Sequence, residues 1–297
     1  MLAERGWLGL KYGPGADWVA DAVLCEELPR AGSGGVSAGV CAHTGIATPP
    51  LATFGTEAQQ ARWLEPAIRG EKIAALAITE PDAGSDVAAI RTRAERVDGG
   101  WVVNGAKTFI TNGVRADFYV TAVRTRPEPG HGSLSFLVVE AGDGVTARPL
   151  EKLGWHASDT AEIAFEDVAV PDGALLGEEG RGFYLIVANF QWERLLMSLG
   201  AVGSMRATLE RVTAILGERG GARGDDGQAR HPARELRAPG RVLRAARRRR
   251  ARGRARPRAR RPRRAARPDR RRHGRDHARD PGEDAGAVRT SPAAVRE

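Results

Sequence analysis

Hydrophobic and polar positions change their spacing three times along the 297-residue chain. Between residues 15 and 31 the apolar side chains recur at helical intervals, and a second helix-like run extends to about Ala47 after a Gly/Ser stretch at 32–35. A third helical run covers residues 57–68 and follows Thr56, a residue type that suits a helix N-cap. The sequence therefore predicts a mainly helical N-terminal domain over residues 1–73.

The pattern becomes that of short strands from residue 74. Residues 74–79 form a brief apolar run, and from Arg91 β-prone segments alternate with Gly-containing turns. Three dipeptides have the composition of hairpin turns, because Asn, Asp and Gly tolerate positive φ: Asp98-Gly99, Asn104-Gly105 and Asn112-Gly113. Further strand-like segments are 118–125, 134–140 and 161–170. These features predict an all-β domain over residues 74–175.

Helical spacing returns at Gly182 and should break near 217–221, so that residues 176–220 form a further helical segment. Residues 221–297 are dominated by Arg, Ala, Gly and Pro and contain no aromatic residue. Such a segment buries too little apolar surface to offset an ordering entropy of about 1–2 kcal/mol per residue. We therefore expect a disordered Arg-rich tail after an α+β multi-domain body.

Charge divides the chain at the same point. Residues 222–297 contain 26 Arg, no Lys and nine acidic residues, a formal charge of +17, whereas residues 1–221 carry −8. The net charge of +9 and the pI near 10.4 therefore describe the tail and give no sign that the body binds nucleic acid.

The two cysteines, Cys25 and Cys41, are too few for a disulfide framework or a zinc site, and the sequence predicts no metal site. Both lie in apolar, helix-like surroundings, which favours their interpretation as small buried hydrophobic residues. The sequence has neither a signal-peptide pattern nor a stretch of about 18 apolar residues that could span a bilayer. We expect a reduced, cytoplasmic protein with no membrane partner.

The segment Ile78-Thr79-Glu80-Pro81-Asp82-Ala83-Gly84-Ser85-Asp86 is the sharpest candidate for chemistry. It predicts a strand that ends in a tight loop, with hydroxyls at 79 and 85 and a glycine at 84 that permits close approach. Such loops suit a phosphate or the edge of a heterocycle. An ordinary Pro-Asp turn is the alternative, and spacing alone favours it.

This segment resembles the first signature of the acyl-CoA dehydrogenase family, and three further segments extend the resemblance in the same order. Residues 106–113 resemble the family's second flavin-contacting segment, residues 153–171 its closing β segment, and residues 176–183 the entry into its C-terminal helical domain. The resemblance implies an N-terminal helical domain, a middle β-barrel domain and a four-helix bundle, of which residues 176–220 would be the first helix.

The resemblance also implies that FAD is the cofactor and that six residues contact it: Leu76, Ile78, Thr79, Ser85, Phe109 and Thr111. Thr79 would bond the pyrimidine edge, and Thr111 would hydrogen-bond near N5, the atom that accepts the hydride. Phe109 would stack against the isoalloxazine ring. Ser85 would reach the cofactor phosphates or the thioester end of the substrate.

The implied reaction is desaturation of an acyl-CoA thioester to trans-2-enoyl-CoA, with electron-transferring flavoprotein as the acceptor. Removal of the α-proton requires a carboxylate in a dry pocket, where desolvation raises its pKa. A branch similar to the isovaleryl-CoA and long-chain dehydrogenases supplies it from a Glu-Arg pair on the first bundle helix. Glu193 is therefore the candidate base, and Arg194 its neighbouring substrate-side partner; the alternative is a solvent-exposed charge pair.

Matches to the family end near Leu216, where the composition changes abruptly. We hypothesise a frameshift near codon 220, which would leave several residues without the helices that normally bury them: Phe190, Leu195, Leu196, Leu199 and Val202. Because the family assembles homo-oligomers through this region, a homo-oligomer is expected of the family and doubtful here.

Two further hypotheses come from other classes of protein. The chain is either an inactive remnant that keeps the motifs without binding FAD, or a polyanion-binding protein that acts through its Arg-rich tail by counterion release. Because the tail has no aromatic residues for base stacking, such binding would be non-specific for nucleic acid.

Overall fold

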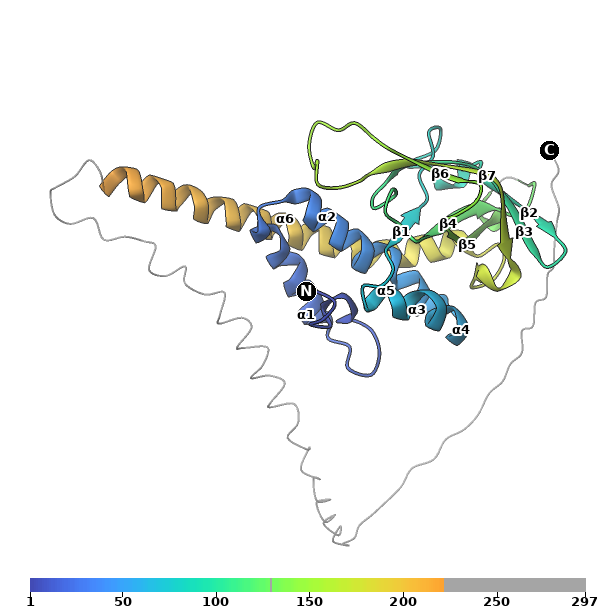
Figure 1. Ribbon diagram of the computed structural model, residues 1–297, viewed down its shortest axis with the longest axis horizontal. Helices are drawn as coiled ribbons and strands as arrows, with labels where there is room; N and C mark the ends of the chain where they lie inside the picture. Colours follow the sequence, from blue (N-terminus) through green and yellow to red (C-terminus); the bar gives the residue numbers. More distant parts are fainter. Residues whose placement is uncertain (129, 222–297) are drawn as a thin grey trace, which may run out of the picture. The chain divides into compact units, whose positions relative to one another are not determined.

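The computed structural model describes residues 1–128 and 130–221, which lie within one of the two units into which the chain divides (Figure 1). The predicted disordered tail and its proposed polyanion binding fall on residues outside this described part. No helix in the described ranges is both long enough and apolar enough to cross a membrane.

The N-terminal part is helical, as predicted. This part contains five α-helices: α1 Trp18–Glu27, α2 Gly34–Cys41, α3 Pro49–Phe54, α4 Glu57–Gln59 and α5 Glu65–Ile68. Short helical segments precede or link them: the 3-10 helices η1 Trp7–Gly9 and η2 Leu28–Ala31, and the π-helical segments η3 Ala42–Ala47 and η4 Gln60–Leu64. Thr56 caps α4 as predicted, in a reciprocal capping box with Gln59. The Gln59 amide also donates to the carbonyls of Gly173 and Leu175, which ties α4 to the sheet.

Eight strands follow: β1 Ala74–Ala77, β2 Arg93–Val97, β3 Gly100–Ile110, β4 Phe118–Arg124, β5 Leu134–Glu140, β6 Val145–Pro149, β7 Ala161–Pro171 and β8 Leu175–Leu176. They pair in the order β6-β7-β3-β2-β4-β5-β8, and β1 lies parallel to β4. Short 3-10 turns join some of them: η5 Val87–Ala89, η6 His131–Ser133 and η7 Asp172–Ala174. The prediction of an all-β middle segment is confirmed, although β6 and β8 were not among the predicted strands.

β2 and β4 share a single residue pair, Arg93 with Arg124, which joins two halves of the sheet, β6-β7-β3-β2 and β4-β5-β8. The two halves pack face to face, and Tyr119 of β4 meets Phe165 of β7 edge-on, with ring centroids 6.1 Å apart. Within the described residues the end strands β6 and β8 do not pair with each other, so hydrogen bonds do not close the predicted barrel. The shortness of β8, two residues long, leaves little backbone for such closure.

The turn predicted at Asn104-Gly105 is wrong, because β3 continues through it. The ladder to β7 shifts register between Val103 and Gly105, and Gly105 has φ +146°. A Cβ at this position would lie 2.6 Å from the Cα of Thr92, so the glycine marks a β-bulge against a neighbouring strand. Asp98-Gly99, in contrast, joins β2 to β3, and Gly99 has the positive φ that the turn requires.

The long helix α6, Gly182–Gly221, corresponds to the helical segment that the sequence predicted over 176–220. It lies beside α1, η2, η3 and β5 (Figure 1). The Asn189 amide donates to the Ile46 carbonyl at 2.9 Å. Farther along, the Arg30 guanidinium forms a bidentate pair with Glu210 at 2.6 and 2.8 Å. These contacts fix α6 against the N-terminal helices.

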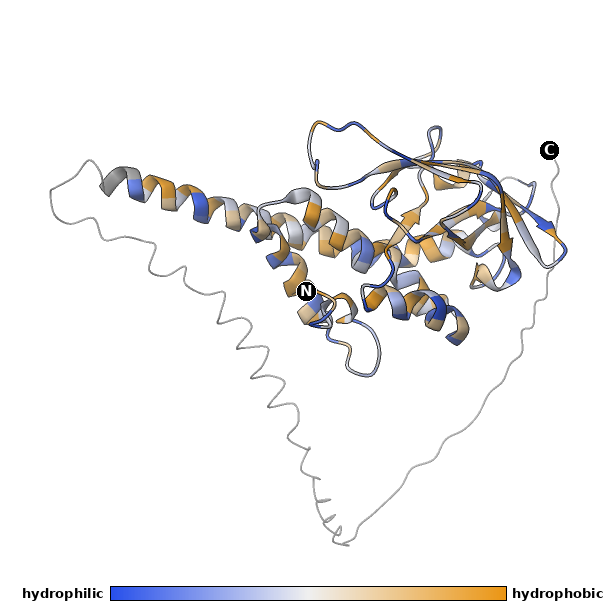
Figure 2. Cartoon of the chain, viewed as in Figure 1, coloured by the Kyte–Doolittle hydropathy of each residue, from blue (hydrophilic) through white to orange (hydrophobic). Residues whose placement is uncertain are grey.

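Hydrophobic residues continue to the far end of α6, as Figure 2 shows, and several are exposed there, including Met205 and Leu209. Of the residues predicted to lack burial partners, Leu195 and Val202 are exposed, whereas Phe190 and Leu199 are half-buried. The prediction is wrong for Leu196, which is only 3% exposed. Its side chain fills the space above Gly45, where an added Cβ would lie 2.8 Å from Leu196 Cδ1.

Candidate active site

A cavity of about 1170 Å³ lies between the β segment, α2 and α6. Its wall includes all eight residues that the sequence singled out: Leu76, Ile78, Thr79, Ser85, Phe109, Thr111, Glu193 and Arg194. The fold therefore brings together three segments that are separated by up to about 110 residues. Such convergence of apolar walls and a few polar groups is typical of a small-molecule site.

The loop after β1 is shaped by the Glu80 carboxylate. Glu80 and Ala83 exchange backbone hydrogen bonds of 2.8 and 3.2 Å, which close a tight turn. The carboxylate itself accepts from the backbone N–H groups of Arg91 at 2.6 Å and Thr92 at 2.9 Å. These bonds hold both ends of the loop that presents Thr79 and Ser85 to the cavity.

Lys107 joins this loop to β3 from beneath. Its fully buried ammonium donates to Glu80 Oε1 at 2.8 Å and to the Ile78 carbonyl at 2.9 Å, and Thr108 N–H donates to the Thr79 carbonyl at 2.8 Å. Burial lowers the pKa of Lys107 to about 8, although Glu80 opposes the shift. Burial raises the pKa of the Glu80 carboxyl, but Lys107 and the backbone donors outweigh it and hold that pKa below its ordinary value.

The sequence indicated this loop and strand but not the buried ion pair beneath them. A lysine inside a predicted strand, in Ala106-Lys107-Thr108-Phe109, was the available signal.

Phe109 occupies an unusual backbone conformation at the end of β3. Its φ is +59°, and the register to β7 shifts between Lys107 and Ile110. A bulky L-residue at positive φ is strained, and a bulge of this kind turns a side chain out of the strand's regular alternation. The ring is 68% exposed and lies on the cavity wall, so the strain serves to present an aromatic face there.

Thr111 lies at the junction between the strands and the N-terminal helices. The next residue, Asn112, has φ +65° and donates its amide to the Gly39 carbonyl of α2 at 2.9 Å. The Tyr119 hydroxyl donates to the Gly113 carbonyl at 2.8 Å and supports the same turn from the β4 side. The turn directly after Thr111 is therefore fixed by two hydrogen bonds, and Thr111 itself lies on the cavity wall.

Glu193 reaches the cavity from α6. Its Oε2 atom is buried and has no hydrogen-bond partner among the described residues. Burial raises the pKa of this carboxyl, and the neighbouring Arg194 opposes the shift. The Arg194 guanidinium lies 5.6 Å from the centre of the Phe190 ring. The alternative of a solvent-exposed charge pair does not describe Glu193, because an exposed carboxylate would not bury an unpaired oxygen.

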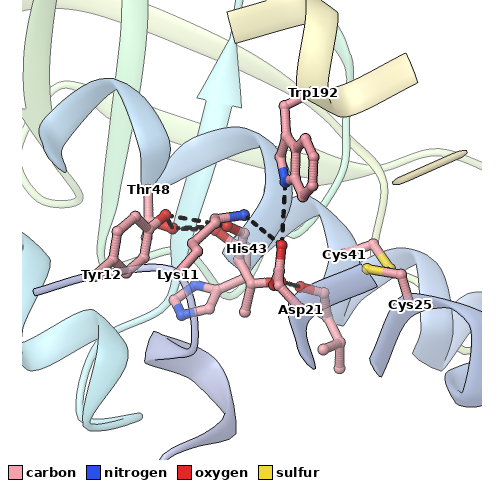
Figure 3. Close-up of polar contacts among 10 residues, drawn as sticks. Lys11, Tyr12, Asp21, Cys25, Cys41, His43, Thr48 and Trp192 are labelled. Carbon is pink, nitrogen blue, oxygen red and sulfur yellow. Dashed lines mark hydrogen bonds and ion pairs between the residues drawn. The ribbon is translucent and has the colours of Figure 1, made fainter. Parts of the chain in front are cut away.

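Trp192, the residue before Glu193, fixes the helical turn of α6 that carries both. Trp192 Nε1 donates to Asp21 Oδ2 at 3.1 Å, and the same carboxylate accepts from the buried Lys11 ammonium at 3.3 Å (Figure 3). Trp18 also packs edge-on against Trp192, with ring centroids 4.8 Å apart. These contacts hold the rotation of α6 at the level of the cavity.

Trp155 is a cavity residue that the sequence interpretation left without a role. It has φ +54°, its side chain is 59% exposed, and it lies on the wall beside α2. A Cβ on Gly34 would come within 2.8 Å of its indole nitrogen, so the glycine makes room for it. A large aromatic residue directly after a glycine, in Leu153-Gly154-Trp155, was the signal that could have found it.

Two family descriptions match consecutive parts of the chain. Residues 1–71 match the acyl-CoA dehydrogenase N-terminal domain, and residues 75–168 match the acyl-CoA dehydrogenase middle domain.

Individual relatives agree with this result. The chain is 37% identical over 218 residues to the mitochondrial isovaleryl-CoA dehydrogenase of Arabidopsis thaliana, and 37% identical over 225 residues to the mitochondrial long-chain specific acyl-CoA dehydrogenase of Mus musculus. Each match covers 73% of this chain and 52% of the relative, so the chain spans about half the length of these relatives.

Solved structures give the same match. The acyl-CoA dehydrogenase of Geobacillus kaustophilus is 42% identical with a TM-score of 0.68, covering 72% of this chain and 58% of that one. An acyl-CoA dehydrogenase of Bacillus anthracis, described as complexed with FAD, is 33% identical with a TM-score of 0.67, covering 78% of this chain and 40% of that one.

Proposed function

The chain belongs to the acyl-CoA dehydrogenase family, and from this premise we propose that its cavity binds FAD and an acyl-CoA thioester and desaturates the thioester to trans-2-enoyl-CoA. The observation that carries the proposal is the buried, unpartnered Glu193 oxygen on the wall that also holds Thr79, Phe109 and Thr111. Buried carboxyls are normally hydrogen-bonded, so one held without a partner in a cavity is suited to accept a proton from a ligand.

The residues present fit a flavin. The cavity wall offers neutral hydroxyls on Thr79, Ser85 and Thr111 and an exposed aromatic ring on Phe109, which suit the polar edge and the face of a heterocycle. Gly84 leaves open space, since an added Cβ would contact only Thr79 Cγ2 at 3.9 Å. The apolar side chains of Leu76 and Ile78, which line the same wall, would cover the ring system. Bound FAD would supply the hydride acceptor.

Glu193 would remove the α-proton. The α C–H of a thioester is a weak acid, so the base must be stronger than an ordinary carboxylate, and the raised pKa of Glu193 meets that need. Because Trp192 is tied to Asp21, the base would keep its direction without forming a hydrogen bond of its own. Ser85 and Arg194, which line the same cavity as the base, would contact the substrate.

The electrons would then pass to electron-transferring flavoprotein, the acceptor implied by the family resemblance. Such a reaction belongs to the catabolism of fatty acids or amino acids, which agrees with the substrates named in the two mitochondrial relatives.

Turnover of the full chain with added FAD, a panel of acyl-CoAs and an artificial electron acceptor tests the proposal. We expect enoyl-CoA to form, and Glu193→Gln to lose at least about 10²-fold in rate while retaining FAD, as expected for loss of a general base. The matched control is Glu178→Gln, a change of the same chemistry outside the cavity wall. Equal rates for Glu193→Gln and Glu178→Gln would contradict the role of Glu193.

A further inference from the structure

The only two cysteines of the sequence lie against each other in the wall of the cavity. Cys25 of α1 and Cys41 at the end of α2 have their sulfurs 3.8 Å apart, both as free thiols (Figure 3). Both line the cavity; Cys25 is 2% exposed, and Cys41 is half-buried. The proposed dehydrogenation uses neither sulfur.

The two thiols differ in chemistry because of their surroundings. The hydrogen bond between the sulfurs lowers the pKa of Cys41, and burial opposes this shift. The same bond and burial raise the pKa of Cys25. Of the buried ion pair nearby, Asp21 raises the pKa of both thiols and Lys11 lowers it, each by less than the bond between the sulfurs. Cys41 is thus the better nucleophile and the more accessible sulfur, and Cys25 is placed to attack second.

We propose that Cys25 and Cys41 form a redox modification site, which a low-molecular-weight disulfide such as oxidised glutathione converts to an intramolecular disulfide. The Cys41 thiolate attacks one sulfur of the oxidant, forms a mixed disulfide and releases one glutathione thiolate. Cys25 then loses its proton to solvent and attacks Cys41 Sγ, which releases the second glutathione. The two protein thiols are oxidised by two electrons, and one glutathione disulfide is reduced to two thiols.

The geometry requires little movement. A disulfide has its sulfurs about 2.05 Å apart, so the present 3.8 Å must shorten by less than about 2 Å, which side-chain rotation can share between the two residues. The bond would tie α1 directly to α2. Because α1 also carries Asp21, the acceptor for Trp192, the same bond would stiffen the contact of α6 beside Glu193. An effect of oxidation on acyl-CoA binding rests on the proposed function, whereas disulfide formation does not.

The test is intact-mass analysis of the full native chain after incubation with glutathione disulfide. We expect the folded chain to lose two hydrogens and keep no glutathione, and dithiothreitol to reverse the change. In urea the same treatment should instead give glutathione adducts, because the unfolded chain no longer holds the two sulfurs together.

Single variants separate the two sulfurs. Cys25→Ser and Cys25→Ala should each trap one glutathione on Cys41, whereas Cys41→Ser should leave the buried Cys25 largely unmodified under native conditions. Circular dichroism identifies any variant that fails to fold, and the wild-type comparison between buffer and urea needs no variant. Two free thiols after prolonged treatment of the folded wild type, or adducts on both cysteines, would overturn the proposal. Because the mass readout requires no flavin, its failure is distinct from failure of the dehydrogenase proposal.

Discussion

Replacing Lys107 with Met removes the ammonium that lies between Glu80 and the Ile78 carbonyl. The two side chains of the pair are 0% and 5% exposed, and their charged atoms are 2.8 Å apart. Breaking a buried ion pair by removing one partner costs about 3–5 kcal/mol, because the other charge remains buried without compensation. Glu80 keeps its bonds from the N–H groups of Arg91 and Thr92, so we expect a loss of about 3 kcal/mol, the lower end of that range.

A double-mutant cycle measures this effect directly. Free energies of unfolding would come from urea titrations followed by far-UV circular dichroism at pH 7. Glu80→Gln combined with Lys107→Met should recover part of the loss, because it removes the uncompensated buried charge, whereas the single amide oxygen can accept from only one of the two backbone N–H groups. The matched control is Arg93→Met, which breaks an exposed pair with Glu95 and should cost less than about 1 kcal/mol. If Lys107→Met also costs less than about 1 kcal/mol, or if the double variant is no more stable than it, the reasoning is refuted.

Three further predictions follow from single residues. Phe109→Gly should have a free energy of unfolding about 1 kcal/mol higher than Phe109→Ala, because only glycine adopts the positive φ without strain. Both variants should bind FAD more weakly than the wild type. Equal thermal stability of the two variants would contradict backbone strain at this position. Because the pKa of Glu193 is raised from 4.5, kcat/KM should fall with decreasing pH before that value is reached, and a pH–rate profile that stays flat down to 4.5 would contradict its role as the base. The buried His43 accepts from Ala74 N–H and bonds to the Ala67 carbonyl as a neutral ring, and burial lowers its pKa below 6.5. Since the unfolded chain then binds more protons than the folded chain, the free energy of unfolding should decrease as pH falls from 6.5 through the lowered pKa. His43→Gln should lose this pH dependence, so parallel plots of unfolding free energy against pH for the variant and the wild type would contradict the prediction.

Periodicity was sufficient for most elements, because helices and strands here bury one regular face. Residues 134–140 form β5 with the predicted bounds, and Thr56 caps its helix through the side chain that the sequence indicated. The Asn104-Gly105 prediction failed because the same dipeptide suits a hairpin turn and a bulge, and only contact with Thr92 decides between them. The edge strand β6, Val145–Pro149, was missed because it is short, polar and ends in proline.

The sequence motifs predicted the residues of the candidate site, but not the contacts that hold these residues in place. The resemblance indicated Thr79, Phe109 and Glu193, and the fold brings all three to one cavity. The Glu80–Lys107 pair and the two thiols depend on contacts between residues 27 and 16 positions apart, which spacing along the chain does not reveal. The strain at Phe109 is a property of the folded backbone, so no sequence pattern announced it.

The visible spectrum of the purified full chain, recorded with FAD before and after anaerobic addition of mixed acyl-CoAs, tests the central claim most directly. The account predicts a bound flavin band that bleaches on addition of substrate and stays unbleached in Glu193→Gln. A chain that takes up no FAD, or that binds FAD which no acyl-CoA bleaches, would contradict it.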